Sequence, residues 1–183
     1  MFTKVKKRYM DRRAIVRGQM QQVDCAVRSD GRSPAGQFLD ALQKGAWDRP
    51  ETSEPADEQI DDYHWFLNAI RHWANTGEPV YRHAAKALQD GVWEFRHSDK
   101  RLTFFDTDGS GGYTPKLPIQ HHADAEAPDS DFWQIPYFDR LIRLGHAFTK
   151  VSQKTPPHDL AEAQKVREED LNHDRSTRSD VDR

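Results

Sequence analysis

The feature that most constrains the fold is a change of apolar period at Gly91. Before it, apolar residues recur every three or four positions up to Gly77, the pattern of an amphipathic helix. These residues are Ile60, Tyr63, Phe66, Leu67, Ile70 and Trp73. After it, residues 92–96 and 101–105 alternate apolar and polar positions, which predicts two strands joined by a turn over residues 97–100. A chain with both periods is expected to belong to the α+β class.

Other segments complete the predicted order of elements. Residues 22–28 alternate like a half-buried strand, and Ser33 before Pro34 is typical of the start of a helix. The run LIRLGHAFTK predicts a third sheet strand, and Thr155 before Pro156 predicts another helix start. We therefore expect a small antiparallel sheet with helices packed on one face.

Charge and composition divide the chain into a domain with charged ends. Residues 1–20 hold seven Lys and Arg against one acid, which predicts a basic N-terminal extension. Residues 21–171 form the predicted domain, interrupted at 106–138 by glycines, prolines and acids typical of a long flexible insertion. Residues 172–183 are predicted to be a disordered charged tail.

Composition also limits the class of protein. The net charge of -3 and the lack of any apolar run long enough for a membrane span predict a soluble, cytoplasmic protein that does not bind membranes. Its single cysteine, Cys25, excludes an internal disulfide. Adjacent histidines such as His121 and His122 point opposite ways in extended chain, so we expect neither a metal site nor a cofactor.

Four stretches in fixed order resemble a known toxin family. They read DGRSPAGQFLDAL, EPVYRHAAKALQDGVWEFR, RLTFF and GHAFTKVSQKTPPHDLAEAQKVREE, and they span about residues 22–169. Together they are similar to the phage-derived, HigB-like branch of the RelE/ParE superfamily of type II toxin-antitoxin systems. The positions that match its motifs include Gly91, Glu94-Phe95-Arg96, Arg101 and the run from His146 to Pro156.

The resemblance implies a fold and an activity. The expected fold is RelE-like, and the expected activity is metal-independent cleavage of mRNA, in most relatives on the ribosome. The expected partners are mRNA, the ribosome and a helix-turn-helix antitoxin that holds the toxin inactive.

Metal-free RNA cleavage needs cations that stabilise extra negative charge on the phosphate. Arg96 and Arg101 sit on neighbouring predicted strands at positions that oppose the apolar residues, so both guanidinium groups are expected on one sheet face. We assign them to the scissile phosphate. Lys150 and Lys154, at the end of the third sheet strand, are expected to stabilise the developing charge.

Proton transfer needs a group that titrates at a useful pH. The candidates are His146, Glu94 and His97. His146 matches the family motif, but it shares strand parity with Leu144 and Phe148, which predicts a ring facing the core. Three further cations complete the predicted RNA-binding set: Lys86, Lys100 and Arg143.

Alternative interpretations remain open at this point. Arg96 and Arg101 would equally suit cross-strand pairing with Glu94 or Asp99 on a solvated face. Lys150 and Lys154 would equally suit an ordinary strand end. Trp65 and Trp73 are expected in the core or in an antitoxin interface. The acidic insertion, and Val151 where the family has a second lysine, favour an alternative function. That alternative is a non-catalytic interaction protein of the same fold, either a topoisomerase inhibitor or a phage remnant.

Overall fold

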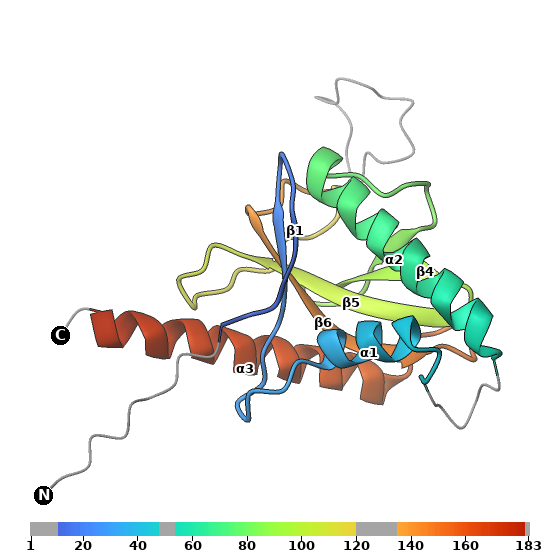
Figure 1. Ribbon diagram of the computed structural model, residues 1–183. Helices are drawn as coiled ribbons and strands as arrows, with labels where there is room; N and C mark the ends of the chain where they lie inside the picture. The colour runs from blue at the N-terminus through green and yellow to red at the C-terminus, as the bar shows by residue number, and fades with distance from the viewer. Residues whose placement is uncertain (1–10, 48–53, 120–134, 182–183) are drawn as a thin grey trace, which may run out of the picture.

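A six-stranded sheet lies at the centre of the fold, with helices on both of its sides (Figure 1). The computed structural model describes residues 11–47, 54–119 and 135–181. The combination of one sheet with separate helices confirms the α+β class. The elements are β1 (Ala14–Arg17), β2 (Gln22–Cys25), α1 (Pro34–Gln43), α2 (Ala56–Thr76), β3 (Ala85–Ala87), β4 (Trp93–His97), β5 (Lys100–Thr107), β6 (Leu141–Thr149) and α3 (Pro157–Val181).

The strand order is β1-β2-β6-β5-β4-β3, and the sheet is mixed rather than purely antiparallel. β2 and β6 run parallel, with Val23 opposite Ile142 and Cys25 opposite Leu144. The expectation of an antiparallel sheet was therefore wrong for this pair. Parallel neighbours need a long connection, and here the chain from α1 to β5 supplies it.

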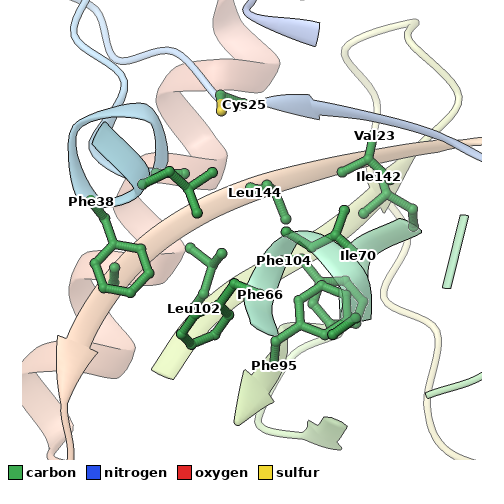
Figure 2. Packing of buried hydrophobic residues seen from close by; sticks show 14 of the residues in the cluster. Val23, Cys25, Phe38, Phe66, Ile70, Phe95, Leu102, Phe104, Ile142 and Leu144 are labelled. Atoms are coloured by element: carbon green, nitrogen blue, oxygen red, sulfur yellow. The ribbon is translucent and has the colours of Figure 1, made fainter. Parts of the chain in front are cut away.

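The expectation of helices on one face was also wrong. α1 and α2 cover the face that carries Phe95, Leu102 and Phe104, which pack with Phe66 and other core residues (Figure 2). α3 covers the opposite face, where Val166 and Leu171 pack with Phe105 and Ala26. Every residue of β5 is buried, so both of its faces need cover.

Two of the predicted helix ends are confirmed, whereas α3 begins at Pro157 and not at the predicted Pro156. The Ser33 hydroxyl accepts a hydrogen bond from the Gly36 amide at 3.1 Å, as an N-cap does. α2 ends where Gly77 adopts a left-handed conformation with φ of 73°. The sequence thus determines these two helices locally.

Both predicted chain ends differ from expectation where the structure describes them. β1 lies within the predicted extension 1–20 and pairs with β2; Lys4 to Arg8 lie outside the described residues. Residues 172–181 are helical, not disordered, because they continue α3. Ion pairs fasten this helix to the sheet: Asp170 binds Arg12 and Arg143, and Asp174 also binds Arg12.

The insertion at 106–138 is tied down at its base. Asp106 belongs to β5, and its carboxylate binds the Lys116 ammonium and accepts the Asp139 amide at 2.6 Å. Lys116 also contacts Asp139 at 2.9 Å. Residues 120–134, which include His121, His122 and most of the predicted acidic cluster, lie outside the described residues.

Candidate functional site

The β4–β5 hairpin brings three predicted site residues together. Arg96 lies opposite Arg101 in the register, and Glu94 lies opposite Thr103. Their neighbours Phe95 and Leu102 point into the α1/α2 core, so strand alternation directs the charged side chains to the other face of the sheet. This confirms the predicted placement of both arginines on one face.

Glu94 is the centre of the site and is completely buried. Its Oε1 lies 3.7 Å from Nε of Arg101 and 3.8 Å from Nε of Arg96. Both separations exceed hydrogen-bond distance, and within the described residues neither carboxylate oxygen accepts a hydrogen bond. The Nε groups of Arg96 and Arg101 are buried and equally unpartnered there.

Two lysines from other elements join this site. Lys86 lies opposite Glu94 in the β3–β4 register, and Lys150 directly follows β6. Both act electrostatically on Glu94. We call the five residues the Glu94 cluster: Lys86, Glu94, Arg96, Arg101 and Lys150.

Burial is the main cause of the pKa shifts of three groups in the cluster. Burial raises the pKa of Glu94, although Arg101, Lys150, Arg96 and Lys86 all oppose that shift. Burial also lowers the pKa of Arg101 and of Lys150; attraction to Glu94 opposes this, but repulsion from neighbouring cations adds to it. Each of these three groups is therefore less easily ionised than it is in water.

The hairpin turn holds the cluster in position. Nη1 of Arg101 donates to the carbonyl oxygens of Ser98 and Lys100, both at 2.8 Å. The Lys150 amide donates to the carbonyl of Asp99 at 2.7 Å, which fixes the end of β6 beside the turn. Ser98 has φ of 53°, the left-handed conformation of a tight turn. One turn thus fixes the Arg101 guanidinium and the backbone of Lys150.

His146 does not face the α1/α2 core, so that prediction was wrong. Leu102 pairs with Ala147 and Phe104 with Leu144, so β6 advances three residues where β5 advances two. This bulge reverses the strand parity. His146 consequently shares the α3 side with Phe148, on whose ring it stacks at 5.6 Å. Its Nε2 lies 2.8 Å from Oδ1 of Asp159 in the first turn of α3.

Three predicted cations lie elsewhere. Lys100 projects to the α2 side, where its buried ammonium contacts Asp62, Glu54 and Asp99. Arg143 is buried under α3 and bound to Asp170 at 2.9 Å. Both were predicted to bind RNA, but strand parity directs each of these side chains into a buried ion pair. Lys154 is exposed on the segment between β6 and α3.

His97 also lies on the α2 side, away from the Glu94 cluster. Its Nε2 contacts Oδ1 of Asp62 at 2.9 Å, and burial lowers its pKa despite that carboxylate. His97 is therefore part of a structural contact with α2 and does not share a face with Arg96 and Arg101.

Sequence reasoning missed two polar residues near the site. Thr103 lies opposite Glu94, and its hydroxyl donates to the His146 carbonyl at 2.9 Å, which joins β5 to the bulge in β6. Asp159 orients His146 from another element. Alternation within RLTFF was a sufficient signal for Thr103, whereas the partnership with Asp159 depends on how α3 docks.

No model of a known protein family and no curated protein matches this chain. Within the described residues, no group of three or more His, Cys, Asp or Glu side chains is arranged to hold a metal ion. None of the described helices is both long and apolar enough to cross a membrane.

Proposed function

We propose that this chain is the toxin of a type II toxin-antitoxin system, a metal-independent endoribonuclease of the RelE/ParE type that cuts mRNA on the ribosome. The observation that supports this most is the Glu94 cluster, in which four cations surround one buried carboxylate. The toxin-like motifs in the sequence point the same way. A cytoplasmic location and a helix-turn-helix antitoxin belong to the same proposal.

The cluster suits a phosphate group for an electrostatic reason. Its cations outnumber its only acid, and mutual repulsion contributes to the lowered pKa of Arg101 and Lys150. A bound phosphate would relieve that repulsion, and guanidinium groups hold phosphate oxygens in paired hydrogen bonds. The unpartnered Nε groups of Arg96 and Arg101 are donors that such a ligand, or a shift of Glu94, would satisfy.

The reaction needs a base and an acid. In the proposed step, the ribose 2′-oxygen forms a bond to the adjacent phosphorus while the bond from phosphorus to the 5′-oxygen breaks, leaving a cyclic phosphate and a 5′-hydroxyl. Glu94 accepts the 2′-OH proton, a role that its raised pKa favours. His146, oriented by Asp159, returns a proton to the leaving 5′-oxygen. Arg96, Arg101 and Lys150 stabilise the extra negative charge, with Lys154 on the adjoining segment as a further phosphate contact.

The test is inducible expression of the chain with mapping of RNA ends. The wild type is expected to arrest growth and to produce new 5′-hydroxyl ends in translated messages. Arg101→Ala is expected to remain folded and to lose this cutting. Arg32→Ala is the matched control, because Arg32 is an exposed arginine paired with Asp30 outside the cluster. Equal cutting by wild type and Arg101→Ala would overturn the assignment.

A second candidate is an anion-binding interaction protein of the same fold that does not cut RNA, for instance a topoisomerase inhibitor. It is favoured by the complete burial of Glu94, which suits a charge that only positions the surrounding cations. In that case the wild type would arrest growth without new RNA ends, and a gyrase supercoiling assay would show inhibition.

A further inference from the structure

A group of aromatic rings lies on the α2 side of the sheet, opposite the face that carries the Glu94 cluster. The Trp65 ring stacks on His97 with centroids 4.3 Å apart and planes within 12°. Tyr81 is tilted against Trp65 at 6.2 Å and is 48% exposed. Trp73, the other tryptophan of α2, is fully buried in the core. We call Trp65, Tyr81 and His97 the aromatic platform.

The platform is more than a margin of the core. His97 is fixed by Asp62, so the ring under Trp65 is held in place. Tyr81 has nearly half of its surface in solvent, and its neighbour Val80 is 38% exposed. Val80 and Tyr81 therefore leave apolar surface in solvent beside the fixed ring pair.

Backbone contacts connect the platform to the Glu94 cluster. The Ala84 amide donates to the Tyr81 carbonyl at 2.9 Å, and the Arg96 amide donates to the Ala84 carbonyl at 2.8 Å. Two residues further on, Lys86 lies opposite Glu94. The edge strand β3 therefore lies between the two groups, with the rings on the α2 side and the cations on the other.

The surface between the two groups is cationic and exposed. Two cations, Arg82 and Lys86, are exposed along this edge. Aromatic rings beside a line of cations are what single-stranded nucleic acids bind, because bases stack on the rings while the cations follow the phosphates. A protein helix that docked here would need acidic residues and an apolar stripe instead.

We propose that single-stranded RNA crosses the β3 edge from the Glu94 cluster to the aromatic platform, where a flanking base stacks on Tyr81 and the exposed edge of Trp65. This inference rests on the proposed function and extends it, since it places a nucleotide beside the one that is cut. Trp65 then has a role outside the core and outside a protein interface.

The probe is a short, labelled 2′-O-methyl RNA strand, which cannot be cut because its 2′-oxygen is blocked. Tyr81→Ala is expected to weaken binding roughly 5- to 150-fold, the equivalent of about 1–3 kcal/mol per stacked base. Tyr81→Phe keeps the ring and is expected to bind like the wild type. Tyr137→Ala is the matched control, because Tyr137 is 93% exposed near the start of β6.

A second readout is the tryptophan fluorescence of Trp65 in the wild type. RNA that stacks on the platform is expected to quench tryptophan fluorescence, and Trp65→Phe is expected to remove the quenched component. Unchanged affinity in Tyr81→Ala, or equal loss in Tyr137→Ala, would overturn the inference. So would tight binding of an acidic helical peptide at Tyr81 in place of RNA.

Failure of this inference and failure of the proposed function are distinguishable. If the wild type cuts RNA but Tyr81→Ala binds the probe normally, the platform is not a base site and the endoribonuclease proposal stands. If the probe binding depends on Tyr81 but no cutting occurs, the endoribonuclease proposal falls and the RNA path stands. If the wild type does not bind the probe, the RNA path is overturned.

Discussion

Lys100 and Arg101 are adjacent in β5 and both are buried, yet their surroundings are opposite. Lys100 faces α2, and its ammonium lies 2.7 Å from Asp62 and also binds Glu54. Burial would lower the pKa of Lys100, but hydrogen bonds to Asp62 and Glu54 raise it overall. Arg101 faces the other side, where its Nε lies 3.7 Å from the Glu94 carboxylate and burial lowers its pKa.

The difference shows two uses of charge in a single hairpin. On the α2 side, carboxylates match the buried cation, and the arrangement stabilises the fold. On the other side, the Glu94 cluster keeps charges that are poorly matched, at a cost to stability. Perturbed ionisable groups of this kind are common in functional sites, where a bound ligand supplies the charge that balances them.

The largest expected effect is on catalysis by Glu94→Gln. This change keeps the size of the side chain and removes the proposed base, so the rate of RNA cutting should fall about 10²- to 10⁴-fold. Cleavage of a message bound to ribosomes, followed by mapping of the new RNA ends, measures it. Affinity for the uncut 2′-O-methyl strand should rise or stay the same, since an acid next to the phosphate is gone. Normal cutting by this variant would mean that Glu94 only positions the cations.

The next effect is on stability and tests the comparison directly. Lys100→Met leaves Glu54 and Asp62 without their cation, so the free energy of unfolding should fall by about 3–5 kcal/mol. Arg101→Met should cost about 1 kcal/mol or less, because the charge it removes is poorly matched. Urea denaturation measures both. Equal losses would contradict the distinction between the two sides of the hairpin.

The hairpin also shows what the sequence can and cannot predict. Strand alternation was enough to place Arg96 and Arg101 together, and the helical period with Ser33 and Gly77 was enough for α1 and α2. The face that Lys100 occupies follows from the same parity. These features depend on a few neighbouring residues and not on contacts between distant segments of the chain.

Other features depend on distant parts of the chain. The bulge that turns His146 toward α3 arises where β6 passes Thr103, and a period of two does not reveal an extra residue. α3 has few apolar residues, and ion pairs to Arg12 and Arg143 hold residues that look disordered in isolation. The parallel pairing of β2 with β6 likewise joins segments far apart in sequence.

A smaller effect is expected from pH. The pKa of Glu94 is raised in the folded chain, so between the ordinary glutamate range and that raised value the native state holds more protons than the unfolded state. Its contribution to stability is present at low pH and is lost as pH rises through this window. Glu94→Gln should lack this loss and exceed the wild type at neutral pH by about 1 kcal/mol. Urea denaturation as a function of pH tests the sign.

The smallest effect concerns Lys86, which is exposed. Lys86→Ala should weaken binding of the uncut RNA strand modestly and reduce the slope of log affinity against log salt by about one phosphate contact. Lys44→Ala, an exposed lysine at the end of α1, is the matched control and should leave the slope unchanged. A reduced slope in both variants would mean that RNA is bound by general surface charge.

The most direct test of the account is the titration of Glu94 by NMR, with its side-chain carboxyl carbon labelled. In the free protein its pKa should lie above the ordinary glutamate range, because the carboxylate is buried and accepts no hydrogen bond within the described residues. Adding the 2′-O-methyl RNA strand should raise it further, since a phosphate would sit beside it. An ordinary or lowered pKa that does not respond to RNA would contradict the claim that this cluster binds phosphate.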